Sequence, residues 1–313
     1  MKIVILDAKT LGTVPNISEI GKFGEVVAYD TTPPELTGKR VSDADIVITN
    51  KVIINEAVMR KCPRLKLICI SATGMNNVEL DAAKKHGIVV KNAAGYSSHS
   101  VAQHTFAMIF QLANQLNYYD RYVKSGQYAK SDIFTHYGPP SFELHGKNYG
   151  IIGMGDIGKT VANIAEGFGA EVCYYSTSGK NTRQNYPSVT MAELLKSSDI
   201  ISIHAPLNEQ TQNLIRQNQL EMMKTNAILV NVGRGGIVHE GELAEALDDQ
   251  KIGGACVDVF GIEPIEADNP LLKVKHPERL VLSPHNAWAS IQARTKLIDI
   301  VIENIRSFLE KKL

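Results

Sequence analysis

The chain has 313 residues, of which 44% are hydrophobic and 21% are charged, a composition typical of a globular protein with roughly two domains. Its 33 basic residues balance its 33 acidic ones, and the zero net charge argues against nucleic acid or a membrane surface as a partner. The 4 cysteines are scattered without a Cys-x-x-Cys pair, which indicates free thiols in a reducing compartment. No apolar run is long enough to span a membrane, and the first one is too short for a signal peptide, so we expect a cytoplasmic protein.

Residues 1–92 alternate strand and helix patterns, which predicts a parallel sheet covered by helices. The expected strands are 3–6, 26–29, 46–49, 67–70 and 88–91, with helical or irregular stretches over 18–23, 54–61 and 78–86.

Two loops of this first half are candidate substrate contacts, because ligands of open parallel sheets bind beyond the carboxyl ends of strands. Asn50 and Lys51 follow one expected strand, and the stretch 72–75 follows the next. Gly74 would let an anion approach backbone N–H groups, although a plain turn would explain it equally.

A long helix is expected over 99–124, because apolar residues recur along one face from Val101 to Leu116. We interpret it as the connection into a second domain. An irregular and aromatic stretch follows over 125–145.

The stretch 147–170 predicts a strand, a tight turn and a helix, and the turn carries Gly153, Gly155 and Gly158. In this motif the first glycine permits the turn and the second lets the backbone approach a pyrophosphate, whereas the third lets the helix pack closely on the strand. The new helix directs unpaired N–H groups and the positive end of its dipole at phosphates. The stretch therefore predicts a dinucleotide site.

The remaining chain predicts a doubly wound sheet of the Rossmann type. Its later strands are expected at 172–175, 200–204, 227–231, 255–259 and 280–282, with helices at 191–197 and 240–249 between them. The segment 288–313 reads as one amphipathic helix.

The adenosine side of the predicted cofactor site departs from the usual pattern. A NAD site usually has an acidic residue about 20 positions after the glycines, bonded to the ribose. Here no Asp or Glu occurs over 173–191; Ser176 stands where the acid is expected, and Lys180 and Arg183 are close by. These residues alone slightly favour NADP, because no carboxylate would repel a 2′-phosphate. Solvated loop charges are the alternative interpretation.

Three strand-end stretches carry groups suited to acid–base and anion chemistry. Arg234 lies between glycines, and its guanidinium can bind a carboxylate with two donors. His285 follows a strand and a proline, and histidine exchanges protons near neutral pH. Glu263, if it reaches His285, would orient the ring and favour its protonated form. Each could instead be an ordinary loop residue.

Two other chemistries find no support in the sequence. A zinc site would need a motif such as His-Glu-x-x-His or paired cysteines, and neither occurs. A serine hydrolase would need Gly-x-Ser-x-Gly, which is also absent. We therefore expect no metal ligands.

Five ordered motifs resemble those of the D-isomer-specific 2-hydroxyacid dehydrogenases, and the resemblance covers essentially the whole chain. They are GMGDIG at 153–158, HAPLN at 204–208, NVGRGGIV at 231–238, VDVFGIEP at 257–264 and PHNAWAS at 284–290. Within the family, ATGMNNVEL at 72–80 and SVAQHT at 100–105 look most like glycerate dehydrogenases, also called hydroxypyruvate reductases.

The resemblance implies an α/β fold with two domains, each a parallel sheet with flanking helices. A flavodoxin-like substrate domain would comprise 1–98 and 288–313, because the last helix returns to it. A Rossmann-type cofactor domain would comprise 99–287. Members of the family are commonly homodimers built on the cofactor domain.

The resemblance also implies a role for individual residues. Arg234 would orient the substrate, His285 would be the acid/base and Glu263 its partner. The residues expected to bind substrate or tune its pocket are Asn50, Lys51, Thr73, Gly74, Met75, Tyr96 and Trp288. The residues expected to bind the cofactor are Thr105, Gly153, Gly155, Asp156, Ile157, Gly158, Ser176, Thr177, His204, Pro206, Val232, Gly233 and Asp258.

The function implied is reduction of a small 2-keto acid, such as hydroxypyruvate, glyoxylate or pyruvate, to the D-2-hydroxy acid by hydride transfer from a nicotinamide cofactor. The family favours NAD(H), whereas Ser176 leaves NADP(H) open. A D-lactate dehydrogenase is the alternative within the same class. An NAD(H)-sensing protein of the corepressor type is the alternative from another class.

Overall fold

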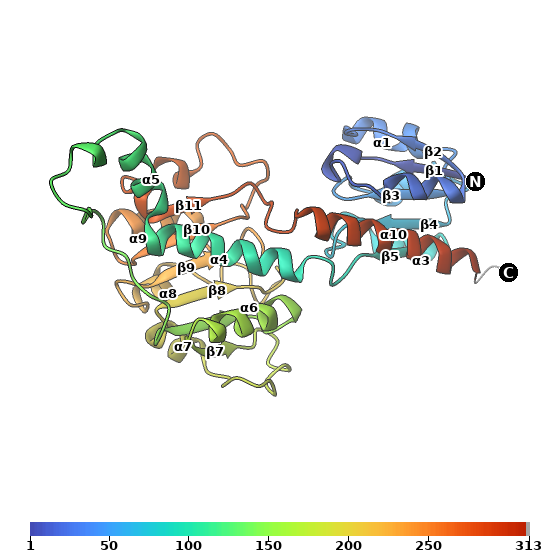
Figure 1. Ribbon diagram of the computed structural model, residues 1–313. Helices are drawn as coiled ribbons and strands as arrows, with labels where there is room; N and C mark the ends of the chain where they lie inside the picture. Colours follow the sequence, from blue (N-terminus) through green and yellow to red (C-terminus); the bar gives the residue numbers. More distant parts are fainter. Residues whose placement is uncertain (311–313) are drawn as a thin grey trace. The chain divides into compact units, whose positions relative to one another are not determined.

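The computed structural model describes residues 1–310. The chain forms two compact units, one from Met1–Ser97 with the segment that begins at Ala289, and one from Ser98–Trp288. We call them unit 1 and unit 2. Each contains one parallel sheet with flanking helices (Figure 1), which confirms the expected α/β class.

The sheet of unit 1 has five strands in the order β2-β1-β3-β4-β5. They are β1 (Lys2–Ile5), β2 (Glu25–Ala28), β3 (Ile46–Thr49), β4 (Leu67–Ile70) and β5 (Val89–Asn92). Every residue of β3 and β4 is buried, as the apolar runs predicted for strands covered on both faces. The order is the flavodoxin-like one, and it reverses between β1 and β3, where ligands of such sheets bind.

The helices of unit 1 are short except for the last. They are η1 (Ala8–Thr10), η2 (Ile17–Phe23), α1 (Pro34–Val41), α2 (Glu56–Met59), α3 (Leu80–Lys85) and α10 (Ile291–Glu310). α10 packs against β4 and η2, and buries Leu297, Ile298 and Val301 at helical spacing. Asn16 ties it further, because its amide donates to the Thr295 carbonyl at 2.9 Å. Helix α1 has no counterpart among the elements expected from the sequence.

The sheet of unit 2 has six parallel strands in the order β11-β10-β9-β8-β6-β7. They are β6 (Asn148–Ile152), β7 (Glu171–Tyr175), β8 (Ile200–Ile203), β9 (Ile228–Asn231), β10 (Gly254–Val257) and β11 (Leu280–Leu282). All six lie within a residue or two of the strands expected from apolar runs. The order reverses between β6 and β8, which places the glycine-rich turn at the point where doubly wound sheets bind ligands.

Helices cover both faces of this sheet. The elements are α4 (Ser98–Asn114), α5 (Leu116–Lys124), η3 (Tyr128–Lys130), α6 (Asp156–Gly167), α7 (Met191–Ser197), α8 (Gln217–Glu221), α9 (Glu240–Asp248), η4 (Pro270–Lys273) and η5 (Pro277–Arg279). One core cluster joins α4 and α6 to the sheet, and another joins α7, α8 and α9 to it. Successive strand residues such as Ile151 and Ile152 fall in different clusters, as the alternation of side chains along a strand requires.

The expected helix over 99–124 is wrong in one respect, because it breaks at Gln115. This residue has φ 51°, and α4 ends before it while α5 begins after it. The carbonyls of Leu112 and Ala113, which would bond the next helical turn, accept instead from the Gln115 side chain at 3.0 Å and from Phe142 N at 3.2 Å. One of the two donors at the break, Phe142 N, thus comes from outside the two helices.

The four cysteines are free thiols, as expected. Burial raises the pKa of Cys62 to about 11 and that of Cys69 to about 12, so neither is a thiolate nucleophile at neutral pH. Among the helices of residues 1–310, none combines the length and the apolar character needed to cross a bilayer.

Candidate active site

The glycine-rich turn after β6 has the backbone that the motif predicts. Gly153 has φ +95°, and a Cβ there would lie 2.9 Å from the Ala205 backbone nitrogen. A Cβ on Gly158 would collide with the Gly153 carbonyl oxygen, so α6 packs against the turn at a distance only glycine allows. Both positions therefore need glycine for sterics within unit 2.

The second glycine of the turn is open to a ligand. A Cβ on Gly155 would meet no atom within 4 Å, so the space above it is free. Gly155 is also the N-cap of α6 and supplies no side-chain cap, which leaves the first N–H groups of a twelve-residue helix available. An open glycine before an uncapped helix N-terminus fits a pyrophosphate. Asp156 is exposed in the first turn and Ile157 is half-buried behind it.

The loop after β7 lies against this turn. Ser176 is buried, and its Oγ accepts from Asn181 N at 3.3 Å. The Asn181 side chain donates in turn to the Met154 carbonyl, which ties the loop to the glycine-rich turn. Lys180 and Arg183 are exposed, and within residues 1–310 neither takes part in an ion pair that the structure records. The next residue after Ser176, Thr177, is half-buried.

His204 directly follows β8, beside the same turn. Its Nε2 lies 2.9 Å from Ser202 Oγ, whereas its Nδ1 is buried without a partner among the described residues. Part of the residue is exposed, yet burial of the ring lowers the pKa of His204 to about 3, so the ring is neutral at physiological pH. Pro206, two residues later, is exposed.

The turn after β9 is shaped by Asn231. Its Oδ1 accepts from Gly233 N at 3.1 Å, and its Nδ2 donates to the Arg234 carbonyl at 3.0 Å. Val232 and Gly233 are buried, and Arg234 is half-buried with its Nη1 2.8 Å from the Gly233 carbonyl. The turn lies directly against the loop after β10, because a Cβ on Gly235 would collide with the Phe260 carbonyl.

The loop after β10 brings Glu263 to His285. His285 Nδ1 lies 2.6 Å from Glu263 Oε2, and the other carboxylate oxygen accepts from Phe260 N at 3.0 Å. A carboxylate on Nδ1 holds the proton there and leaves Nε2 for chemistry. His285 has φ 51°, a conformation that the surrounding hydrogen bonds must hold in place.

Asp258 holds the turn that carries His285. Its side chain is 1% exposed, and its carboxylate accepts from Ser283 Oγ at 2.6 Å, Asn286 N at 3.0 Å and Ala287 N at 3.1 Å. Its carbonyl also accepts from His285 N at 2.7 Å. The sequence motif indicated Asp258 only as a cofactor residue, so its part in shaping the turn is new.

In unit 1, a second buried aspartate shapes a predicted substrate loop. Asp7 lies two residues after the end of β1 and is 5% exposed. Its carboxylate accepts from Asn50 N at 2.9 Å, Lys51 N at 2.7 Å and Val52 N at 3.3 Å. Asp7 was missed from the sequence, although an Asp directly after an apolar strand was a visible signal.

The other predicted substrate loop follows β4, next to β3 in the sheet, so both loops leave the same edge of unit 1. Thr73 is exposed, and its carbonyl accepts from Asn92 Nδ2 at 2.7 Å; Gly74 and Met75 are half-buried. Tyr96 is half-buried in unit 1, whereas Trp288 packs on the core of unit 2.

Thr105, also expected to contact the cofactor, lies in α4. It is fully buried, and its hydroxyl donates to the Val101 carbonyl at 2.8 Å, a bond that a threonine in a helix readily makes to the preceding turn. Its contact with the cofactor stays a prediction.

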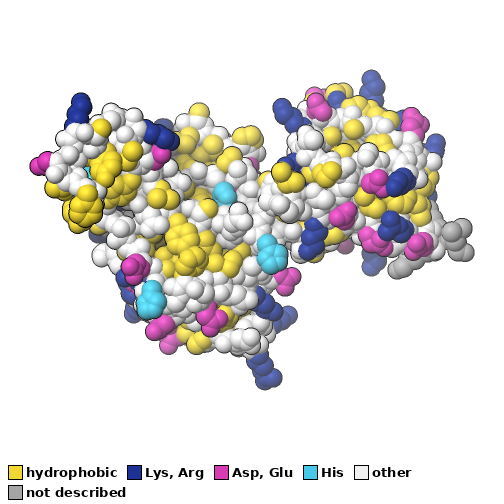
Figure 2. Space-filling view, viewed as in Figure 1, with side chains coloured by type: hydrophobic (Ala, Val, Ile, Leu, Met, Phe, Trp, Pro, Cys, Tyr) yellow, Lys and Arg dark blue, Asp and Glu magenta, His cyan; other side chains and the backbone are white. Residues whose placement is uncertain are grey.

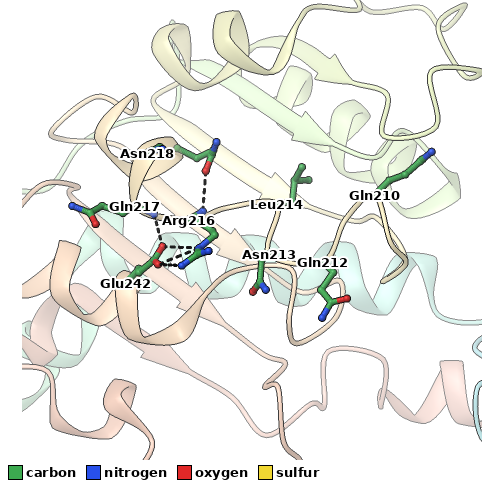
Figure 3. Close-up of a pocket in the computed structure, with 9 residues that line it drawn as sticks. Gln210, Gln212, Asn213, Leu214, Arg216, Gln217, Asn218 and Glu242 are labelled. Atoms are coloured by element: carbon green, nitrogen blue, oxygen red, sulfur yellow. Dashed lines mark hydrogen bonds and ion pairs between the residues drawn. The ribbon is translucent and has the colours of Figure 1, made fainter.

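A polar pocket of about 510 Å³ lies elsewhere in unit 2 (Figure 3). It is lined by Gln210, Gln212, Asn213, Leu214, Arg216, Gln217, Asn218, Gln219 and Glu242. Arg216 Nε donates to Glu242 Oε1 at 3.1 Å, and the hydrogen bond from Arg216 lowers the pKa of Glu242. None of the residues predicted for the site lines this pocket. Across residues 1–310 no group of three or more His, Cys, Asp or Glu side chains could hold a metal ion.

Comparisons with known proteins agree with the geometry. The model of a family described as D-isomer specific 2-hydroxyacid dehydrogenase, NAD binding domain, matches residues 106–287. The chain is 35% identical over 317 residues to a hydroxypyruvate reductase of Blautia hydrogenotrophica, covering 99% of this chain and 97% of that one. It is 35% identical over 312 residues to a glycerate dehydrogenase of Methylorubrum extorquens, again covering 99% and 97%.

A solved structure extends the similarity to the whole fold. An acyclic imino acid reductase in complex with NADPH and D-Arg superimposes with a TM-score of 0.87 at 31% identity. The match covers 100% of this chain and 98% of that chain.

Proposed function

The chain belongs to the D-isomer-specific 2-hydroxyacid dehydrogenases, and on that premise we propose that it reduces a small 2-keto acid to the D-2-hydroxy acid with a nicotinamide dinucleotide. The observation that carries the proposal is the 2.6 Å contact between His285 and Glu263, in a loop that lies against the Arg234 turn. In this proposal His285 is the proton donor, Glu263 is the carboxylate that orients it, and the Arg234 guanidinium binds an anion with two donors. We propose hydroxypyruvate or glyoxylate as the substrate, in line with the relatives, and D-lactate formation from pyruvate as the alternative.

The cofactor would be held mainly by backbone of unit 2. The open Gly155 and the uncapped N-terminus of α6 favour a pyrophosphate lying along 155–157. Ser176 would bond the adenosine ribose and Asp258 the nicotinamide carboxamide. The proposed contacts also include Gly153, Gly158, Thr177, His204, Pro206, Val232 and Gly233.

When bound, the nicotinamide cofactor supplies the hydride. The protein supplies the remaining electrostatics and the proton. Arg234 would bind the substrate and stabilise the negative charge that builds on the keto oxygen. Protonated His285 donates its Nε2 proton to the keto oxygen, while Glu263 holds Nδ1. In the oxidative direction the ring starts neutral and accepts that proton.

For the cofactor we propose NAD(H), with NADP(H) also accepted. The family favours NAD(H), but no carboxylate in the loop after β7 opposes a 2′-phosphate, and Lys180 and Arg183 are exposed there. A point of support for dual use is that Ser176 offers a hydroxyl, which bonds a ribose oxygen or a phosphate oxygen equally.

We also propose a homodimer formed through unit 2. α5 and the stretch after it project from the sheet (Figure 1), and Figure 2 shows hydrophobic side chains gathered there. Phe134 is 89% and Tyr137 86% exposed, and Leu116, Val123 and Ile133 are more than half exposed. Such a patch on a surface excursion is typical of a protein interface. Light scattering should give the mass of two chains for the wild type and of one for Phe134→Asp/Tyr137→Asp; a monomeric wild type would contradict the proposal.

A substrate panel tests the reaction. Hydroxypyruvate, glyoxylate and pyruvate are each supplied with NADH and then NADPH, and cofactor oxidation is followed at 340 nm. We expect saturable reduction of at least one keto acid, with chiral analysis showing the D product. Cofactor binding without oxidation by any of the three would instead favour the sensing protein.

A further inference from the structure

Three side chains of unit 2 form a chain from α4 to the turn that carries His285. His104 Nε2 lies 2.9 Å from Ser283 Oγ, which in turn lies 2.6 Å from Asp258 Oδ1. The direct separation of His104 Nε2 and Asp258 Oδ1 is 3.7 Å, so the hydroxyl lies between them. α4 packs against β10 and β11, the strands that Asp258 and Ser283 directly follow (Figure 1).

The direction of these hydrogen bonds follows from the protons available. A serine hydroxyl has one proton, and an ionised carboxylate can only accept. The short bond to Asp258 uses that proton, so Ser283 Oγ accepts from the ring and His104 carries its proton on Nε2. The chain therefore runs from the His104 N–H through the Ser283 O–H to the Asp258 carboxylate.

The Asp258 carboxylate needs such donors because it is buried, and a buried charge without partners is costly. Two of its other donors, Asn286 N and Ala287 N, belong to the turn itself. Within residues 1–310, His104 is the one basic side chain at ion-pair distance from it. The segment that contains His285 does not supply this contact. It comes from His104 on α4, which lies 179 residues before Ser283 in the chain.

We propose that His104 is a positioning residue: through Ser283 it fixes the orientation of the Asp258 carboxylate, which holds the turn that presents His285. The inference rests on the proposed function, in which His285 transfers the proton and Asp258 meets the nicotinamide carboxamide. If the Asp258 carboxylate rotates, it loses its hydrogen bonds to Asn286 N and Ala287 N together. The turn that presents His285 and the proposed contact with the nicotinamide carboxamide are then disturbed at the same time.

Steady-state kinetics with the best keto acid of the panel provide the first test. His104→Ala removes the first donor, and kcat should fall about 2- to 10-fold, the range for a hydrogen bond between neutral groups. KM for the keto acid should stay near the wild-type value, because His104 touches no substrate. His104→Gln offers an N–H donor of similar reach and should restore most of kcat. An unchanged kcat in His104→Ala, or no rescue by Gln in a folded protein, would overturn the proposal.

A double-mutant cycle with Ser283→Ala separates positioning from simple packing. If both residues act through one chain, the double variant should lose no more than the worse single variant. A side chain that merely packs α4 would add its loss to that of Ser283→Ala, and additive losses would reject the chain. Asn114→Ala, at the exposed end of α4, is the control for general loosening of the helix and should keep the wild-type kcat.

A binding measurement does not depend on turnover. Calorimetry compares NADH with ADP-ribose, which lacks the nicotinamide. His104→Ala should weaken NADH binding about tenfold and leave ADP-ribose binding unchanged, because only the nicotinamide end meets Asp258. Equal NADH affinities of variant and wild type would overturn the positioning role. If the NADH pattern holds but no 2-keto acid is reduced, the proposed reaction fails and the positioning role stands.

Discussion

Glu263 Oε2 and His285 Nδ1 lie 2.6 Å apart although 22 residues separate them in the chain. Glu263 itself is held, because its other oxygen accepts from Phe260 N at 3.0 Å. A ring fixed at one nitrogen presents the other at a defined angle, which is what a general acid requires. The first predictions follow from this pair.

His285→Gln should lower kcat by about 10²- to 10⁴-fold, the usual contribution of general acid–base catalysis. Glutamine keeps a polar group of similar length but has no titrating proton. Stopped-flow reduction measures the chemical step, and unchanged dinucleotide affinity shows that the site is intact. Turnover near the wild-type rate would remove His285 from the acid role.

Glu263→Gln should lower kcat for reduction about 10- to 100-fold, the range for a hydrogen bond to a charged group. The amide oxygen can keep the bond from Phe260 N, which preserves the loop, but the NH2 group then faces His285 Nδ1 and cannot hold its proton. Steady-state kinetics measure the loss, and unchanged dinucleotide affinity shows that the site is intact. A kcat equal to that of the wild type would leave Glu263 with a structural role alone.

Arg234→Lys should reduce kcat/KM strongly, because a point charge cannot replace a planar fork with two donors. Arg234→Gln should be worse, since it also removes the charge that stabilises the developing oxyanion. The Asn231 bonds to Gly233 N and the Arg234 carbonyl use the backbone, so the turn should survive both changes. A lysine variant as efficient as the wild type would contradict a bidentate role.

Ser176→Asp should raise the ratio of kcat/KM with NADH to that with NADPH, mainly by weakening NADPH. The new carboxylate would repel a 2′-phosphate and bond a free ribose. Arg183→Ala should move the ratio the same way if its charge meets the phosphate, whereas Lys196→Ala, on α7, is a matched control. A ratio insensitive to Ser176→Asp would place the discrimination outside this loop.

His204 should make the fold sensitive to acid. Burial lowers the pKa of His204 from 6.5 to about 3, so in the unfolded chain it takes up a proton first. The free energy of unfolding is therefore highest above pH 6.5 and falls as the pH drops toward 3, by at most about 1.4 kcal/mol per pH unit from this residue. His204→Gln keeps a group that can bond Ser202 but does not titrate. Urea midpoints at pH 7.5 and pH 5 should fall less in the variant, and parallel declines would refute the assignment.

Much of the fold was predictable because short sequence patterns determine where the buried strands lie. The buried strands β3 and β4 coincide with the expected apolar runs, since a parallel strand covered on both faces must be apolar throughout. The short helices α1 and α8 were missed, because Pro34–Val41 and Gln217–Glu221 are polar segments without a helical stripe.

Part of the chemistry of the candidate site could also be predicted from residue types and their spacing in the sequence. Glycine spacing after a strand pointed to a dinucleotide, and Arg, Glu and His at strand ends pointed to anion binding and acid–base chemistry. The proposed roles of Arg234, Glu263 and His285 came from the sequence. Their contacts did not.

Only the tertiary structure decided what holds these residues in place. Asp7 binds the N–H groups of Asn50 and Lys51 from 43 and 44 positions away, and His104 reaches Ser283 across 179. At the break in the helix, the Phe142 N–H likewise donates to the Ala113 carbonyl, which a continuous helix would use. Local patterns record burial and turn chemistry, whereas hydrogen bonds between distant segments exist only after the sheet order brings their strand ends together. The sequence by itself therefore determined which groups are present at the strand ends, and folding decided which of them meet.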